Sequence, residues 1–534
     1  MAEPEEIIRR HDMLANSRKT WEAHWDEVAD LTDPTRSSIT RQFSPGAKRR
    51  GRLYDSTGTH SGGLLASSLL GAMTNPGGRW FGFATQNRSL MDSHEVVIWL
   101  SEAENAMFRE LARSNFYLQA HEVYLDLVYF GTSALYEEWN TNALALNFDT
   151  IPLGEYFVAE NARGVIDTLS RCFILSARQQ IEEFGAENVS LKVKQAIENK
   201  KPEQEFTIIH SVYPNAERMV GREDYKGKRF YSCYLDKDAK HIIKEGGYEE
   251  FPYQVPRWMV SPGERYGRSP AMTALPDMKV LNKAIELDLR AWAKAIDPPL
   301  MVANDGIIGK IRTTPAALMT VRTDLMVKGI DPIRPFPVGA KFDVTQVKVQ
   351  ELREAVRRAF FVDQLQLQEG PQMTATEVVQ RQEEKLRLLA PIIGRLQAEF
   401  LQPLVERTFA ILLREGRLGQ PPEALQGRDL KIEFIGPMAR IQRMQEAQSL
   451  QRLLVEIGGT LGAIKPEIFD NINGDEAIRL SAEVYGCPPK LLLTTAKVAE
   501  LRQARAQAQQ QAMQKDDMER AGTVMAKMQA GGRR

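Results

Sequence analysis

The sequence predicts an α+β fold that is predominantly helical, and three observations favour it. Apolar residues recur every three or four positions before residue 131 and again after residue 269, a spacing typical of amphipathic helices. Between these regions, short apolar runs alternate with turn sequences, as in β-hairpins. The 534 residues and 43% hydrophobic content suit a soluble globular protein of roughly three or four domains.

Four helices are expected first. They cover residues 4–31, a stretch that closes at Asn75-Pro76-Gly77-Gly78, and about 93–113 and 116–130. One face of the first helix carries Ile7, Leu14, Trp21, Trp25 and Val28. A polar, basic loop, RSSITRQFSPGAKRRGR, separates it from the second helix, which is rich in small residues.

From Gly131 the pattern changes to hairpins. SALYEEW and LALNFD flank the turn NTN, EYFVAENARGVIDTLSR turns at Asn161 to Gly164, and KRFYSCYLDKDAKHIIKE supplies a third hairpin. Among them, SARQQIEEFG predicts a compact helix, which Ser176 and Gln179 cap at its start and Gly185 ends.

The second half returns to helices. Ser269-Pro270 opens one whose apolar stripe is Met278, Leu281, Ile285, Leu289 and Trp292. A proline- and glycine-rich excursion leads to another, DVTQVKVQELREAVRRAFF, with the stripe Val344, Val347, Leu352, Val356 and Phe360. A helix over about 374–415 must bend at Pro391 and Pro403, since each proline removes a hydrogen bond. The strand-like LKIEFIG and a mostly helical C-terminal region follow.

The stretch QEGPQMTATEVVQRQEEK, residues 368 to 385, joins a polar loop directly to a helix start. Thr374 and Glu377 have the spacing of a capping box, which satisfies two free backbone donors. Gly370 and Pro371 keep the helix from extending backwards. We therefore expect a helix fixed at Thr374 and a loop of no fixed structure before it.

Bulk properties argue against several classes of protein. The formal net charge is −1, whereas proteins that grip nucleic acid through its phosphates normally carry a basic excess. Cys172, Cys233 and Cys487 are too far apart to indicate a disulfide framework or a zinc site, and they suit a reducing cytosol. The charged start MAEPEEIIRRHDML indicates no signal peptide, and the longest apolar candidate, GGLLASSLLGAMTNPGG, is too short for a membrane span.

No pattern indicates catalysis, a cofactor or a metal. GIIGKIRT, Gly306 to Thr313, departs from a phosphate-binding loop in its glycine spacing and in the Ile311 that follows the lysine. The seven histidines lack ligand spacing, and Asp236 and Asp238 fit a hairpin turn better than a metal site. No serine lies in a G-x-S-x-G elbow. The sequence gives no reason to expect an enzyme.

Basic residues on the two second-half helices leave three interpretations open. A solvated face interleaved with carboxylates, or ion pairing between subunits, is favoured, because mixed charges seldom grip a polyanion. Weak contact with a polyanion is the third interpretation. The residues are Lys279, Lys283, Arg290 and Lys294 on the first helix and Lys348, Arg353, Arg357 and Arg358 on the second.

Two helices joined by a β-rich excursion, a glutamine-rich loop and a long bent helix form an unusual order. This order resembles the portal (head-to-tail connector) proteins of tailed bacteriophages, particularly the short-tailed podovirus class. Four segments carry the resemblance: YDSTGTHSGGLLASSLLGAMTNPGGRWFGF, PLGEYFVAENARGVIDTLSRCFILSARQQIEEFG, ERYGRSPAMTALPDMKVLN and MTATEVVQRQEEKLRLLAPIIGRLQAEFLQPL. The resemblance implies a homo-oligomeric ring, commonly of twelve subunits, at one capsid vertex, through which double-stranded DNA is packaged, retained and ejected.

The resemblance also implies a layout and a set of partners. The layout is a wing (1–265), two stem helices (266–298 and 341–362), a clip (299–340), a tunnel loop (363–373), a bent wing helix with its connection (374–430) and a C-terminal crown and tail (431–534). The implied partners are DNA in transit, the terminase packaging motor, capsid and scaffolding proteins and tail adaptors. No membrane partner or cofactor is implied, and the virion protein would be made in the bacterial cytoplasm.

The tunnel-loop residues Gln364, Gln366, Gln368, Glu369 and Gln372 are expected to face the channel, because they are polar and mostly uncharged. Two other classes stay open. A DNA-processing enzyme of the packaging machinery would need phosphate-loop or acidic metal-site signatures, which are missing. Another ring-forming virion or tail adaptor that never contacts DNA is disfavoured by the order of stem, clip and stem.

Overall fold

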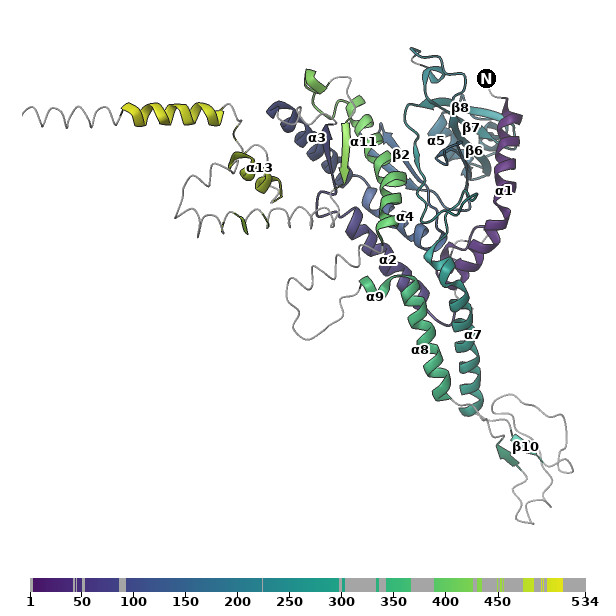
Figure 1. The fold of residues 1–534 in the computed structure, drawn as a ribbon. Coiled ribbons are helices and arrows are strands. Elements are labelled where there is room, and N and C mark those ends of the chain that lie inside the picture. Colours follow the sequence, from purple (N-terminus) through teal and green to yellow (C-terminus); the bar gives the residue numbers. More distant parts are fainter. Residues whose placement is uncertain are drawn as a thin grey trace, which may run out of the picture. The chain divides into compact units, whose positions relative to one another are not determined.

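The computed structural model divides the chain into two compact units (Figure 1), one of residues 1–80 and 107–414 and one of residues 81–106 and 415–534. The structure describes residues 3–41, 44, 46–49, 53–85, 93–222, 224–296, 300–302, 333–335, 342–365, 389–425, 430–434, 449, 452–453, 455, 474–484, 491, 493 and 497–511. Helices, antiparallel sheets and a pair of long helices make up the first unit.

In the first unit, α4 (Phe116–Phe130) packs against both α1 (Pro4–Leu31) and α2 (Thr57–Met73). They confirm three of the helices expected near the N-terminus. Trp25 of α1 is fully buried, and its indole Nε1 donates to the carbonyl oxygen of Phe130 at 3.1 Å. The small residues of α2 allow close packing, since a Cβ at Gly62 would lie 2.2 Å from Cε1 of Tyr129.

A five-stranded antiparallel sheet lies beside α1 (Figure 1), in the order β4-β5-β6-β7-β8. Its strands are β4 (Tyr156–Glu160), β5 (Ile166–Ser176), β6 (Glu205–Pro214), β7 (Phe230–Asp236) and β8 (His241–Tyr248). Neighbouring residues of a strand face opposite sides. Ile208 accordingly packs in the cluster formed with α5 (Ala177–Phe184) and α6 (Leu191–Glu198), and Ile209 packs with Ile7 of α1.

A second sheet of three strands has the order β3-β2-β9. Its strands are β2 (Leu135–Asn140), β3 (Ala145–Thr150) and β9 (Tyr253–Gln254). The three predicted hairpins are β2–β3, β4–β5 and β7–β8, and all are confirmed. The predicted capping box of Ser176 and Gln179 is present at the start of α5, and Gly185 ends that helix.

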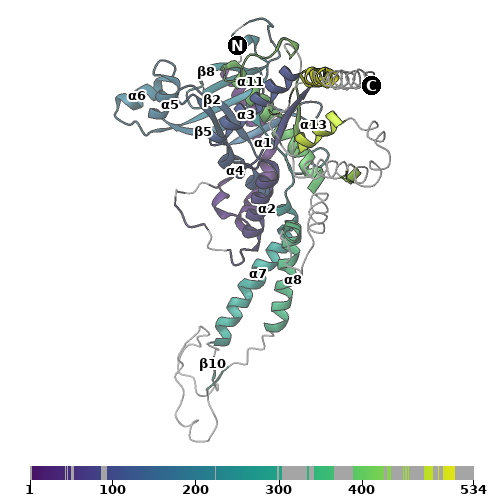
Figure 2. The ribbon, with the colours of Figure 1, turned by 90° about the vertical axis from the view of Figure 1, so that its left-hand side faces the viewer.

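Two long helices of the first unit run side by side (Figures 1 and 2): α7 (Pro270–Ile296) and α8 (Phe342–Ala359). We call this pair the arm. Beyond α7 lie the short strands β10 (Leu300–Val302) and β11 (Ile333–Pro335), which pair antiparallel. The short helix α9 (Val362–Leu365) follows α8.

The helix expected over about 374–415 is described from residue 389 and is irregular. A π-helical turn, Gln397–Leu401, precedes α11 (Gln402–Arg414). Pro403 is the second residue of α11 and has no N–H to donate to the carbonyl four residues earlier, so a wider turn replaces the regular one. This irregularity fits the prediction that proline interrupts the helix here.

The second unit contains a two-stranded antiparallel sheet of β1 (Phe81–Thr85) and β12 (Leu430–Phe434). The sequence predicted β12 but not β1. Helix α3 (His94–Arg113) begins in this unit and continues into the first, and α13 (Gly474–Val484) confirms helix near the C-terminus. Short 3-10 turns elsewhere are η1 (Pro34–Arg36), η3 (Tyr225–Gly227) and η7 (Glu423–Leu425).

Candidate functional site: the arm and its base

The base of the arm is fixed by the predicted cap at Ser269. Its Oγ accepts the N–H of Met272 at 3.0 Å and donates to the carbonyl oxygen of Tyr129 at 2.7 Å. Pro270 occupies the first helical position, where a missing N–H costs nothing. The start of α7 is thereby joined directly to α4.

The faces by which α7 and α8 pack differ in part from the predicted stripes. Met278 and Leu281 of α7 are buried, whereas Leu289 is 50% and Trp292 45% exposed. Among the described side chains of α8 and the turn that follows it, Val349, Val356 and Phe360 are buried. Val347 is 59% exposed, so its place in the predicted stripe was wrong. It lies nine residues before Val356, roughly 180° around the helix at about 100° per residue.

The candidate basic residues of α7 mostly have carboxylate partners within the protomer. Lys279 pairs with Glu27 of α1, while Lys283 and Arg290 both pair with Glu286, at 2.9 and 2.5 Å. The hydrogen bond from Lys283 and the charges of Arg290 and Lys283 lower the pKa of Glu286. Lys294 is exposed near the end of the helix.

Three of the four candidate basic residues of α8 are exposed, and the fourth, Arg353, contacts a residue outside the arm. Lys348 pairs with Glu351 at 2.6 Å on the exposed face. Arg358 Nε donates to the carbonyl oxygen of Glu354 at 3.4 Å, and Arg357 is exposed. Arg353 instead reaches the loop before α2, since its Nε and Nη2 both donate to Asp55 Oδ2 at 3.0 Å.

The sequence reasoning missed the residues that hold the arm. Asp55 Oδ1 accepts the N–H of Thr57 at 2.8 Å, which starts α2, and the backbone N–H of Tyr54 donates to Asn282 Oδ1 of α7 at 2.7 Å. An aspartate just ahead of a small-residue helix is a known start signal and was available in the sequence. Its second partner, Arg353, is too distant in sequence for any local pattern to indicate.

The predicted loop residues lie mainly outside the described part of the chain. Gln364 belongs to α9, which follows Phe361, a residue with a positive φ of 57° after α8. The loop residues Gln366, Gln368, Glu369 and Gln372, the cap residues Thr374 and Glu377, and the glycine pattern of 306–313 all lie outside the described residues.

The π-helical turn carries a second charged junction. Glu399 Oε2 accepts both the backbone N–H and Nε of Arg257, at 3.0 and 3.1 Å. Its Oε1 accepts Nη2 of Arg257 and Nη1 of Arg395, both at 2.9 Å. The irregular turn thus places one carboxylate where it holds four donors, which ties this helix to the segment after β9.

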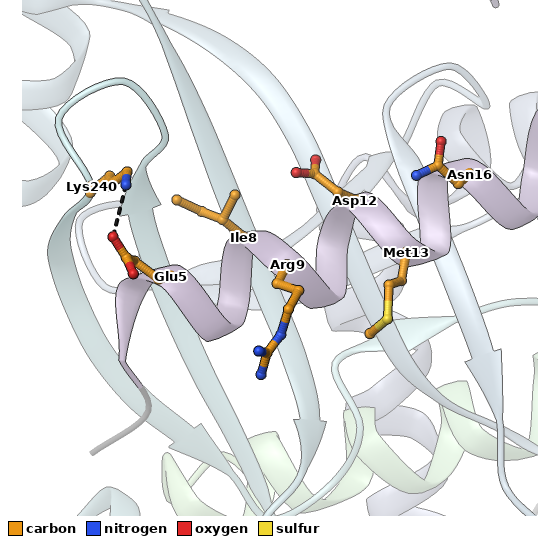
Figure 3. A pocket seen from close by; sticks show the side chains of 7 residues that line it. All are labelled: Glu5, Ile8, Arg9, Asp12, Met13, Asn16 and Lys240. Carbon is orange, nitrogen blue, oxygen red and sulfur yellow. Dashed lines mark hydrogen bonds and ion pairs between the residues drawn. The ribbon is translucent and has the colours of Figure 1, made fainter.

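Elsewhere the described residues offer little for chemistry. A surface hollow of about 400 Å³ (Figure 3) is lined by six residues of α1 and by Lys240, which pairs with Glu5 at 2.8 Å. Asp236 Oδ1 accepts the N–H groups of Asp238 and Ala239, both at 3.0 Å, which confirms the turn interpretation. No group of three His, Cys, Asp or Glu side chains suited to a metal occurs in the described residues.

Among the described residues, no helix is both long enough and apolar enough to cross a bilayer.

Two solved structures show a limited likeness to the chain. The neck of an empty gene transfer agent particle aligns with a TM-score of 0.36 and 12% identity over 81% of this chain and 90% of that one. The virion of a native gene transfer agent particle aligns with a TM-score of 0.33 and 13% identity over 80% and 99%.

Sequence comparison is more decisive. The family described as bacteriophage head to tail connecting protein matches residues 4–493. The probable portal protein of Bordetella phage BPP-1 is 32% identical over 95% of this chain and 92% of its own length. The portal protein of Salmonella phage epsilon15 is 31% identical over 96% and 92%. The matches cover both units and include the arm, its base and the latter part of the chain, so this chain belongs to the bacteriophage head-to-tail connector family, the portal proteins.

Proposed function

We propose that this portal protein assembles into a closed ring, of twelve subunits as is common in the family, at one vertex of the capsid. Double-stranded DNA passes through the ring during packaging and ejection without sequence-specific contacts. The terminase motor, the capsid and scaffolding proteins and the tail adaptors bind its outer parts. The protein is made in the host cytoplasm and ends in the virion.

The observation that carries the ring is a second apolar stripe on α7. Val280 and Leu287 are 56% and 52% exposed, and Ala284 and Ala291 continue their line at helical spacing. Met278, which is buried in the protomer, lies two residues from Val280, roughly 200° around the helix. A helix that is apolar on two opposite sides has one side for its own partner and one for another molecule.

A neighbouring copy is the occupant that fits this second stripe. The outward face of α8 carries Val347 together with Glu351 and Glu354, whereas the flank of the α7 stripe carries Lys283 and Arg290. When α7 of one subunit faces α8 of the next, Glu351 and Glu354 lie opposite Lys283 and Arg290, in addition to the pairs that Glu351, Lys283 and Arg290 form within the protomer. Because the two faces differ, the contact is head-to-tail, and such contacts close into rings when the rotation allows.

The layout implied by the family resemblance is proposed for this chain with the boundaries stated above. The arm elements α7 and α8 fall within the proposed stem segments, and β10 and β11 fall within the proposed clip segment. A net charge of −1 supports a conduit role, because deep electrostatic wells would stall a moving polyanion. The family is one of head-to-tail connectors and both relatives are portal proteins, so we propose a structural role without enzymatic activity.

Electron microscopy of the purified protein tests this function. A closed ring with an axial channel wide enough for duplex DNA supports it. A monomer with ATPase activity overturns it. A closed ring whose channel is too narrow for a duplex instead favours the alternative, an adaptor that does not contact DNA.

The tunnel loop is tested separately by deleting residues 364–372. We expect the ring to assemble normally, because no residue of the α7 stripe is removed, while DNA packaging or genome retention falls. Packaging is measured as the DNA content of particles produced with the variant. Loss of ring assembly would count against a channel role for the loop.

A further inference from the structure

Two adjacent residues ahead of α2 hold both helices of the arm. The backbone N–H of Tyr54 donates to Asn282 Oδ1 on α7 at 2.7 Å. The side chain of Asp55 receives Nε and Nη2 of Arg353 on α8, both at 3.0 Å. Each helix of the arm is therefore held directly by its own hydrogen bonds to Tyr54 or Asp55.

Asp55 is constrained on both of its oxygens. Its side chain is 6% exposed, and a buried carboxylate needs partners for each oxygen. Oδ1 accepts the N–H of Thr57 at the start of α2, and Oδ2 takes the rigid guanidinium fork of Arg353. The start of α2 thus fixes the direction in which this carboxylate meets α8.

The helix that follows is itself fixed to the body. Thr59 Oγ1 donates to the carbonyl oxygen of Thr32 after α1, and the hydroxyl of Tyr129 on α4 donates to the carbonyl oxygen of Thr59 at 3.1 Å. A Cβ at Gly58 would lie 2.6 Å from Sδ of Met278, so α2 also touches α7 closely. Displacement of the arm would have to break contacts with α1, α2 and α4.

We propose that Tyr54 and Asp55 form a latch that sets the position of the arm relative to the rest of its unit. Asp55 is the positioning residue of this latch. Because a small change in arm position alters the rotation between neighbouring subunits, the latch also determines how many subunits close the ring. This last step rests on the proposed ring, whereas the latch itself is a property of the protomer.

The test uses the full chain with Asp55→Asn and Arg353→Gln, singly and together. Asparagine retains an oxygen for the N–H of Thr57 and removes the charge that Arg353 meets. Glu182→Gln is the control, since it breaks an exposed pair on α5, outside the arm, whose side chains are 51% and 62% exposed. Hydrogen exchange of residues 53–57 and of α8 reports the latch, and native mass spectrometry reports the distribution of ring sizes.

We expect amide exchange in these segments to rise by about tenfold in either single variant, because the local opening becomes easier. The double variant adds little to either single one, because both remove the same contact. The variants also form a mixture of ring sizes, and the control behaves as wild type. Unchanged exchange in both single variants overturns the latch.

The two parts of the proposal fail separately. If amide exchange becomes faster while the ring size stays the same, the latch is supported but its effect on subunit number is overturned. If the wild-type protein forms no ring, the proposed function fails, and the exchange comparison on the isolated protomer still decides the latch. Arg353 is 32% exposed, so its glutamine variant is expected to fold even where a change at Asp55 is not tolerated.

Discussion

Two buried titratable side chains of the first unit have pKa values shifted in opposite directions. Burial raises the pKa of Glu137 on β2 to about 7, against weaker opposing effects from Arg407 and Thr408. Burial lowers the pKa of His210 on β6 to about 3, and Tyr253 and Ser232 hydrogen-bond its ring. Near neutral pH, Glu137 is therefore partly protonated, and His210 is neutral.

The amide of Gln254 supports a protonated Glu137. Its Nε2 donates to Glu137 Oε2 at 3.2 Å in the structure, while its buried Oε1 finds no hydrogen-bond partner among the described residues. If the side-chain amide of Gln254 is turned by 180°, its oxygen faces Glu137 and accepts a hydrogen bond from the protonated carboxyl. The two amide orientations place heavy atoms at the same positions and differ only in which atom is nitrogen. Thr408 donates to the other oxygen of Glu137 at 2.7 Å in either case.

Glu137→Gln tests this assignment. A carboxyl whose folded pKa is about 7, against an ordinary value of 4.5, contributes stability fully below pH 4.5 that is lost as the pH rises through 7. The glutamine has no such loss, so its melting temperature should rise relative to wild type between pH 5 and 8. The difference corresponds to about 3 kcal/mol at most, since one pKa unit equals roughly 1.4 kcal/mol. Glu182→Gln on the exposed face of α5 is the control, and a pH-independent difference would contradict the assignment.

At the scale of elements, α2 owes its position to glycines that differ sharply in their surroundings. Gly62 faces the ring of Tyr129 on α4, with no room for a side chain. At Gly63, the next residue of the same helix, an added Cβ would meet no atom within 4 Å. Substitutions at these two neighbouring glycines can therefore measure the effect of close helix packing apart from the effect of helix propensity.

Gly62→Ala and Gly63→Ala should therefore change stability with opposite signs. Alanine at 62 forces Tyr129 and α4 to shift and is expected to cost about 1–3 kcal/mol. Alanine at 63 meets open space and gains roughly 0.5–1 kcal/mol from the lower flexibility of the unfolded chain. Thermal unfolding of both variants beside wild type measures the two effects. Equal destabilisation by both would show that the α2–α4 approach is not tight.

Local signals predicted the elements and the three hairpins well, and the contacts between elements remote in sequence poorly. Ser269, Ser176 and the aspartate turn at Asp236 were visible because caps and turns act within a few residues. Strand β1 was missed because its partner β12 is remote in sequence and two-residue alternation in Phe81–Thr85 is too short to stand out. The contact of Asp55 with Arg353 was missed for the same reason, and the face of α8 was misplaced at Val347.

At the scale of the whole molecule, the second stripe of α7 should be dispensable for folding and required for assembly. Val280→Glu with Leu287→Glu places charges on a face that is exposed in the protomer, so the protomer keeps its melting temperature. Ring assembly is lost, because buried unpaired carboxylates are costly at an interface. Size-exclusion chromatography with light scattering measures the assembly state. Leu191→Glu, at a residue 76% exposed on α6, is the control, and rings formed by the double variant would remove the stripe from the interface.

The order of strands in the five-stranded sheet has a consequence for timing. Every strand pairs with its neighbour in sequence, from β4 through β8, and the longest connection, residues 177–204, carries α5 and α6, so the sheet is built from contacts that are local in sequence. All of its strands and the α1 residues that pack on it are synthesised before residue 249. During translation, this region can fold while the arm is still being made. The nascent chain thus buries one apolar core early, and Arg353 is synthesised after all residues of that core.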